Sequence, residues 1–215
     1  MLSDEYPGKH CSSANAMKSL FAAIARFVTG ANARWIGSAP ENRQRVYFAN
    51  HTSHLDPLVI WASLPPAARA WTRPVAARDY WAKNKLRLYV ANEIFNALLI
   101  ERKKPTAHDN PLEDMRHALG DKHSLIIFPE GSRQIGTEMA PFKGGLFHLA
   151  KDCPQVELIP VLIENLNRIL PKGEFLPVPL LGSVSFGPPI KLETGEEKGA
   201  FLTRAQAAVK ALQKS

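Results

Sequence analysis

Short apolar segments alternate with helix-like segments along most of this chain, and that alternation restricts the folds open to it. The apolar segments are rich in valine, isoleucine and aromatic residues, as is typical of strands buried on both faces of a sheet. We predict strands at 45–50, 74–77, 97–100, 124–128, 156–163 and 184–186. Parallel strands need crossover connections, which are usually helices, so the alternation favours a parallel sheet.

The segments between the predicted strands carry helix signals. Asn110–Glu113 combines a capping residue, a first-turn proline and an acid three positions after the cap, and Gly120 ends that helix. The other helices are predicted at 79–92, 146–151 and 197–212, with one more that begins near Pro57, is capped by Thr52 or Ser53 and ends before Pro65. We therefore predict one α/β domain with a mostly parallel or mixed central sheet flanked by helices.

The N-terminal part of the chain has a different pattern. Residues 1–14 are polar, whereas apolar residues between Ala16 and Ala31 recur at three- and four-residue spacings, which indicates one amphipathic helix. Its apolar face either packs on the protein's own core or lies in the plane of a membrane, which Phe27, Trp35 and flanking basic residues favour. We therefore divide the chain into an N-terminal segment with a membrane-docking helix, residues 1–40, and a folded domain, residues 41–215.

The balance of charge indicates an anionic partner. The formal net charge is +7 and the pI is near 9.5. Nine basic residues lie between Arg69 and Lys104, together with aromatic side chains suited to the headgroup region of an anionic membrane: Trp71, Tyr80, Trp81 and Tyr89. A solvated helix face would have the same composition. A nucleic-acid binder would use the same residue types, but the sequence contains no recognised binding motif, and no nucleic-acid partner is predicted.

Cysteine content and hydropathy bear on the compartment. Cys11 and Cys153 are too few for a disulfide framework, which favours a reducing compartment. No run approaches the ~18 consecutive apolar residues of a membrane-spanning helix. The first ten residues lack the basic-then-apolar layout of a signal peptide. We predict a cytoplasmic protein that binds peripherally to the cytoplasmic face of a membrane.

The turn after the first predicted strand is NHTSHLDP, Asn50–Pro57. A tight turn would bring the Asp56 carboxylate onto the His51 imidazole, where it would orient one ring nitrogen and stabilise the imidazolium. The other ring nitrogen would then be free to take a proton from a hydroxyl or an amine. The sequence contains no G-x-S-x-G serine elbow, so direct attack by an external acceptor is the simpler mechanism.

His54 adds an alternative chemistry to the same turn. His51, His54 and Asp56 together would suit a metal ion, and a metal-dependent hydrolase is the alternative enzyme class. Their spacing matches neither H-E-x-x-H nor a Cys/His zinc pattern, so we expect no metal. We assign His54 to the first turn of the helix, as a capping or solvent-facing residue.

A second polar turn, FPEGSR (Phe128–Arg133), follows the strand at 124–128. Ligands gather at the carboxyl ends of strands in open α/β sheets, so the two turns are expected to form one site. Glu130 is suited to accept hydrogen bonds from hydroxyl groups, Gly131 permits close backbone approach, and Arg133 presents a rigid fork suited to phosphate. An ordinary surface turn with a Glu–Arg pair would have the same composition.

Together the two turns resemble motifs of the glycerophospholipid acyltransferase family, which includes the 1-acylglycerol-3-phosphate acyltransferases. NHTSHLD matches the motif N-H-x-x-x-x-D at Asn50, His51 and Asp56. FPEGSR matches F-P-E-G-[ST]-R, with Ser132 in place of the commoner threonine.

Two further stretches extend the resemblance to roughly residues 45–173. LLIER matches a motif that ends in isoleucine, a variable residue and arginine, at Ile100 and Arg102, although Asn96 and Leu99 replace the usual glycine and phenylalanine. LIPVLIEN matches an apolar motif with Pro160 in the expected place. The order of the four matches makes residues 41–215 an acyltransferase domain by resemblance.

The resemblance implies a reaction and its participants. His51 would be the general base with Asp56 as its partner, and the residues around the acceptor's phosphate and glycerol would be Arg102, Glu130, Gly131, Ser132 and Arg133. It implies an O-acyltransferase of phospholipid biosynthesis, without a cofactor, whose co-substrate is an acyl thioester of coenzyme A or acyl carrier protein. The acceptor would be a lysophospholipid, foremost 1-acylglycerol-3-phosphate, which gives phosphatidic acid. Because the residues near Arg102 depart from the motif, another lyso-lipid, such as a lyso-aminolipid, is the alternative acceptor.

Overall fold

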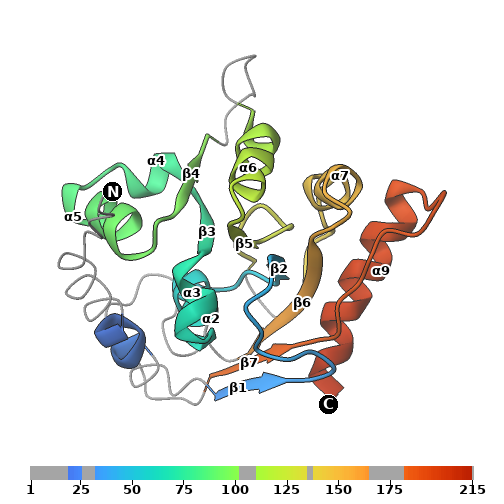
Figure 1. The fold of residues 1–215 in the computed structure, drawn as a ribbon, viewed down its shortest axis with the longest axis horizontal. Helices are drawn as coiled ribbons and strands as arrows, with labels where there is room; N and C mark the ends of the chain where they lie inside the picture. The colour runs from blue at the N-terminus through green and yellow to red at the C-terminus, as the bar shows by residue number, and fades with distance from the viewer. Residues whose placement is uncertain (1–18, 26–31, 102–109, 135–137, 165–181, 215) are drawn as a thin grey trace, which may run out of the picture.

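A mixed seven-stranded sheet forms the centre of the computed structural model, which describes residues 19–25, 32–101, 110–134, 138–164 and 182–214 (Figure 1). The strand order is β1-β7-β6-β2-β5-β3-β4. The strands are β1 (Asn32–Trp35), β2 (Arg45–Ala49), β3 (Thr72–Ala77), β4 (Leu98–Ile100), β5 (Ser124–Ile127), β6 (Glu157–Glu164) and β7 (Ser183–Phe186). β7 is antiparallel to β6, and the other neighbouring pairs are parallel, which confirms the predicted α/β fold with a mixed sheet.

Helices flank this sheet. They are α2 (Asp56–Ser63), α3 (Pro66–Ala70), α4 (Arg78–Trp81), α5 (Lys85–Tyr89), the π-helix η1 (Val90–Ile94), α6 (Pro111–Gly120), α7 (Gly145–Asp152), α9 (Lys198–Ala211) and the 3₁₀-helix η2 (Leu212–Lys214). Residues 19–25 are also helical. Within the described residues, no helix is both long enough and apolar enough to cross a bilayer.

The side chains of β2 show why both faces of the sheet are covered. Successive side chains of a strand point to opposite faces. Val46 and Phe48 are buried in a cluster with side chains of α6, α7 and α9, whereas Tyr47 and Ala49 are buried in a second cluster with side chains of α2 and α3. β2 therefore lies between two apolar layers, as its continuous apolar sequence predicts.

The helix predicted to begin at Asn110 is confirmed, whereas the single helix predicted at 79–92 is wrong. The Asn110 side chain accepts a hydrogen bond from the Leu112 N–H and caps α6. In the other region the chain forms α4, α5 and η1. Asn84 interrupts the helix with extended backbone angles (φ −142°, ψ 135°), and its side chain accepts the Leu86 N–H and caps α5. An asparagine that bonds its own backbone competes with helix continuation, which explains the break.

Two elements, α3 and β1, were not predicted. β1 falls within residues 1–40 and pairs with β7, so the end of that segment is part of the sheet. Trp35 of β1 stacks on Phe186 with a centroid distance of 4.1 Å, so it packs within the fold and does not extend a membrane helix.

The helical residues 19–25 turn their small side chains toward the protein. Ala22 and Ala25 are buried in the cluster that covers one face of the sheet. The large apolar side chains of Leu20, Phe21 and Ile24 are exposed. Along these residues, the predicted apolar face therefore does not pack on the protein's own core. Met17, Phe27, Val28 and Ala31 lie outside the described residues.

Candidate active site

The two polar turns predicted from the sequence meet at the carboxyl ends of neighbouring strands β2 and β5. The backbone N–H of His51 donates to Glu130 Oε1 at 2.8 Å. The backbone N–H of Gln134 donates to the carbonyl oxygen of His51 at 2.9 Å. The two turns therefore lie together, because Glu130 of the second turn and Gln134 just after it both make hydrogen bonds to the backbone of His51.

His51 and Asp56 form the predicted pair. His51 Nδ1 lies 2.9 Å from Asp56 Oδ2, and the Asp56 side chain is fully buried. The same oxygen accepts the backbone N–H groups of Thr52 at 2.7 Å and Ser53 at 2.8 Å. A carboxylate that accepts these bonds requires Nδ1 of the imidazole to carry the proton, which leaves Nε2 as the proton acceptor.

The predicted helix cap is formed in part, because the Ser53 hydroxyl accepts the Leu55 N–H at 3.2 Å in the turn just before α2. The residue that precedes α2 is Leu55, which makes no side-chain capping bond. Thr52 and Ser53 also donate their backbone N–H groups to Asp56, in the first turn of α2. One carboxylate thus orders the turn and orients His51.

Asn50 anchors the start of this turn to the neighbouring strand β6. Its side-chain Nδ2 donates to the Ile163 carbonyl at 2.9 Å, and its Oδ1 accepts the Ile163 N–H at 2.8 Å. The amide therefore takes the place of a peptide group and prolongs the pairing of β2 with β6 by one residue. This buried contact fixes the backbone immediately before His51.

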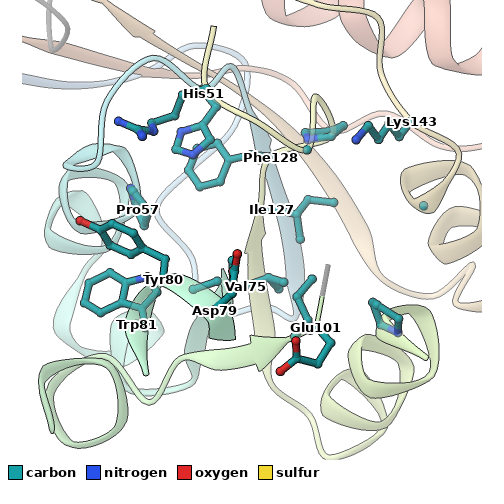
Figure 2. Close-up of a pocket in the computed structure, with 18 of the residues that line it drawn as sticks. His51, Pro57, Val75, Asp79, Tyr80, Trp81, Glu101, Ile127, Phe128 and Lys143 are labelled. Carbon is teal, nitrogen blue, oxygen red and sulfur yellow. The ribbon is translucent and has the colours of Figure 1, made fainter. Parts of the chain in front are cut away.

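The ring of His51 packs against the ring of an aromatic side chain. It stacks on Phe128, with centroids 4.1 Å apart and an interplanar angle of 23°. Figure 2 shows the two rings at one end of a pocket, with the edge of the imidazole open to it. Backbone bonds, Asp56 and Phe128 together hold His51 in one orientation.

The pocket is a cavity of about 480 Å³ bordered by the carboxyl ends of β3, β4 and β5 and by α4, α6 and α7. Its polar lining includes His51, His54, Asp79, Lys83, Glu101, Arg133 and Lys143. Its apolar lining includes Val75, Ile100, Met115, Ile127, Phe128 and Leu146. A mixed lining of this kind suits a ligand that has both a charged head and an aliphatic part.

Two cations border the cavity beside Gly131. Arg133 was predicted from the sequence, whereas Lys143, just before α7, was not. Gly131 has φ +74°, and a methyl group there would lie 2.5 Å from Lys143 Nζ, so the glycine makes room for the amine. In the described part of the chain, neither cation is paired with a carboxylate. The available sequence signal for Lys143 was a basic residue directly after Phe142, in the loop that follows FPEGSR.

The other predicted residues of the second turn do not line the cavity. The Ser132 side chain is exposed, with its hydroxyl 3.5 Å from Gln134 Nε2. Glu130 is only 3% exposed, and burial raises the pKa of its carboxyl above the ordinary value, against the opposing effect of two backbone N–H bonds. Arg102 lies outside the described residues.

The wall opposite His51 is built from α4 and the ends of β3 and β4. Tyr80 stacks on His54, with centroids 4.5 Å apart, and the Arg87 guanidinium lies 4.8 Å from the Tyr80 ring centroid. Figure 2 shows the Asp79 carboxylate pointing into the pocket. Among the residues that the structure describes, no group of three or more His, Cys, Asp or Glu side chains is placed to hold a metal ion. The hydrolase alternative therefore lacks a ligand set in that part of the chain.

Comparisons with known proteins agree with this geometry. The sequence model of a family described as Acyltransferase matches residues 34–164. A 1-acyl-sn-glycerol-3-phosphate acyltransferase of Cocos nucifera is 29% identical over 181 residues, which make up 80% of this chain and 56% of the relative. The corresponding alpha enzyme of Mus musculus is 31% identical over 138 residues, 63% of this chain and 45% of the relative. The chain thus spans about half the length of these curated relatives.

A solved structure shares the fold. The crystal structure of the 1-acyl-sn-glycerophosphate acyltransferase of Thermotoga maritima matches with a TM-score of 0.72 at 18% sequence identity. The match covers 93% of this chain and 78% of that one. Most of this chain therefore shares its fold with that structure.

Proposed function

The chain belongs to the acyltransferase family, and from this premise we propose that it transfers a fatty acyl group from an acyl thioester to the free hydroxyl of a lysophospholipid. The preferred acceptor in this proposal is 1-acylglycerol-3-phosphate, which the similar proteins name, and the product is phosphatidic acid. The donor is the thioester of coenzyme A or of acyl carrier protein. The observation that carries the proposal is the His51–Asp56 pair at the edge of a cavity with two unpaired cations.

The proposed reaction is a single displacement. Nε2 of His51 takes the proton of the acceptor hydroxyl while the oxygen attacks the thioester carbonyl. The tetrahedral intermediate then collapses with cleavage of the C–S bond, and the imidazolium returns the proton to the departing sulfur, which leaves as the thiol. Asp56 holds the imidazole in the required tautomer and stabilises the imidazolium. A positioned base contributes about 10²–10⁴ in rate, and alignment of two bound reactants can contribute more.

The charge of the cavity supports a phosphorylated acceptor. Arg133 and Lys143 line the same cavity as His51, and both charges would attract a phosphate bound there. By resemblance Arg102 and Gly131 would also border the acceptor. The apolar lining, which includes Val75, Ile127 and Leu146, suits an acyl chain.

A lyso-aminolipid is the second candidate acceptor, and one feature favours it. Asp79 and Glu101 border the same cavity as Arg133 and Lys143. Glu101 is 3.3 Å from Arg78, whereas Asp79 has no ion-pair partner in the described part of the chain. A carboxylate in this position would attract an ammonium group.

The decisive experiment is a transfer assay with a panel of acceptors. Purified protein is incubated with a labelled long-chain acyl-CoA or acyl carrier protein and with 1-acylglycerol-3-phosphate, a lyso-aminolipid or monoacylglycerol, and the product is identified by mass spectrometry. The proposal predicts phosphatidic acid as the main product. Transfer to none of these acceptors from either donor would reject it, and a higher kcat/KM for the lyso-aminolipid would favour the second candidate.

We also propose that the protein docks on an anionic membrane beside the cavity. Leu86 and Tyr89 of α5 are 70% and 51% exposed and alternate with Lys85 and Arg87. The exposed apolar side chains of residues 19–25 add a second contact, and both segments lie on the left in Figure 1. Lys83, just before α5, lines the cavity, so a bilayer at this surface would present its lipids to the site.

Only some of the aromatic and basic residues that the sequence assigned to a membrane surface are exposed in the structure. Trp71 and Tyr89 are exposed, whereas Trp81 packs edge-on against Phe95 at 6.5 Å. Arg69 is buried, with its guanidinium 5.2 Å from the ring centroid of Trp61. The docking surface proposed here therefore relies on α5 and residues 19–25.

Co-sedimentation with vesicles tests the docking surface. Each basic residue near an anionic bilayer contributes about 1 kcal/mol, so Lys85→Glu should weaken binding to phosphatidylglycerol vesicles at least about fivefold. Leu86→Glu should weaken it in both low and high salt. Ala207→Glu, an exposed position on α9, is the matched control and should bind like the unmodified protein. Equal binding by all variants, or no preference for anionic vesicles, would rule out this surface.

A further inference from the structure

We propose that Glu130 acts through His51, as the residue that fixes the position of the general base, and that it does not contact the acceptor. This inference rests on the proposed function, because it assigns a role within the same reaction. It replaces the expectation from the motif that Glu130 accepts hydrogen bonds from substrate hydroxyls. The assignment depends on where the two carboxylate oxygens lie and on what surrounds them.

Both oxygens of Glu130 are already used by the backbone. Oε1 accepts the N–H of His51 at 2.8 Å, and Oε2 accepts the N–H of Ala140 at 2.9 Å. The side chain is 3% exposed. Its neighbours Pro129 and Gly131 line the cavity, but Glu130 does not. The carboxylate therefore lies behind the wall that a substrate would touch.

The two bonds connect the turn that carries His51 to the segment that leads into α7. Ala140 lies three residues before Lys143, whose backbone N–H donates to the Pro129 carbonyl at 2.9 Å. Glu130 thus ties the backbone of His51 to the same segment that carries Lys143 to the cavity. One side chain sets the distance between the base and the cations proposed to bind phosphate.

A carboxylate is the group that this position requires. It offers acceptor lone pairs on both oxygens, whereas the isosteric amide of glutamine offers one acceptor oxygen and one NH₂ donor. In Glu130→Gln, one of the two N–H groups would face another donor inside a buried site. The unsatisfied backbone group would shift, and with it either the His51 turn or the segment at Ala140.

Steady-state kinetics of Glu130→Gln distinguish the two roles. A shift of the base by about 1 Å costs about 10²-fold in rate, so we expect kcat to fall about 10- to 100-fold while KM for the acceptor stays within about twofold. Glu138→Gln is the matched control, because it removes the same charge from an exposed position of the same loop. We expect it to keep both constants.

Amide hydrogen exchange supplies a readout that does not depend on activity. In the unmodified protein the His51 and Ala140 amides should be protected, and in Glu130→Gln at least one should exchange faster, beyond any change at the amides of α9. If Glu130→Gln fails to fold, Glu130→Asp retains the charge but shortens the reach, and the same loss of kcat is expected.

Two results would overturn the inference. One is an acceptor KM that rises tenfold or more at an unchanged kcat while the His51 and Ala140 amides of Glu130→Gln stay protected, because Glu130 would then contact the substrate without positioning the backbone. The other is unprotected His51 and Ala140 amides in the unmodified protein. Failure of the unmodified protein to acylate any acceptor would instead reject the proposed function, and the exchange data would still report on the two hydrogen bonds.

Discussion

The cavity has two walls, and they differ in how many buried hydrogen bonds hold them in place. The first wall is the side of His51, and the second wall is the opposite side, formed by α4 and the ends of β3 and β4. On the His51 side, Asn50, His51 and Asp56 make hydrogen bonds to backbone or to one another in buried surroundings, and the neighbouring strands are central in the sheet. On the opposite side, α4 and α5 contain no buried residue, and β4 is an edge strand. This side is held by stacking and by exposed ion pairs such as Arg78–Glu101, which contribute little.

From this difference we expect the first wall to determine the rate of acyl transfer and the second wall to determine which lipid is accepted. The reacting groups need one geometry, and a dense set of buried hydrogen bonds supplies it. The opposite wall borders the proposed membrane surface, and the departures from the family motif lie close to it, with Leu99 in β4 and Asn96 just before β4. Substitutions on the first wall should lower the rate, whereas those on the second should alter which lipid is used or how it is reached.

The strongest test of this contrast compares two histidines that border the same cavity. His51→Ala should lower kcat/KM about 10²–10⁴-fold, because it removes the proposed base. His54→Ala, in the same turn, should retain much of the activity, because it removes a ring that stacks on Tyr80 of the opposite wall. Transfer rates of purified variants with unchanged melting temperatures are the measurement. Full activity in His51→Ala would contradict the assignment, as would equal losses in the two variants.

A second test addresses the anchoring of the first wall. Asn50→Asp removes the donor to the Ile163 carbonyl and places a charge in a buried site. We expect the free energy of unfolding to fall by about 1–3 kcal/mol, measured by urea denaturation, together with a loss of activity. Asn92→Asp, at an exposed position in η1, is the control and should change neither. An Asn50→Asp protein with unchanged stability would show that this contact is not needed.

The backbone of the second wall provides a smaller test. Asn96 has φ +47°, in the left-handed region that glycine adopts freely and asparagine tolerates better than other residues. This explains how asparagine stands where the family motif has glycine. Asn96→Gly should leave stability nearly unchanged, whereas Asn96→Val should cost about 1–2 kcal/mol in thermal or urea unfolding. Equal stability of the two variants would exclude a positive φ at this position.

The smallest expected effect is a pH dependence of stability. Because burial raises the pKa of Glu130, the folded protein retains a proton at pH values where the unfolded chain has released it. Stability should therefore fall as the pH rises from the ordinary carboxyl value to the raised one, and should then level off. Glu130→Gln should flatten this part of the curve of melting temperature against pH. A slope that the variant leaves unaltered would mean that other groups cause it.

The sequence predicts the first wall better than the second. The strands β2, β5 and β6 are recognisable because continuous burial leaves a continuous apolar run, and their loops are placed by the topology of parallel sheets. The division of 79–92 into α4, α5 and η1 is not visible in the same way. The helical spacing continues past Asn84, and the break depends on one side chain choosing its own backbone.

Some contacts within the site could not be predicted from the sequence, for a similar reason. A sequence shows that Glu130 can accept hydrogen bonds, but only the fold shows that the N–H groups of His51 and Ala140 take them. Lys143 belongs to the cavity because its loop returns to Gly131, which is a tertiary contact and leaves no local pattern. Residue type gives the capacity for an interaction, and packing selects the partner.

The bond between Asn50 and Ile163 joins positions that lie 113 residues apart. Ribosomal synthesis delivers the earlier of the two long before the later one, so a nascent chain has no finished catalytic turn until β6 has emerged and taken its place beside β2. Enzymatic competence would consequently arise late in the life of the growing polypeptide, and fragments that stop short of Ile163 should possess the proton-accepting imidazole without the scaffold that aims it.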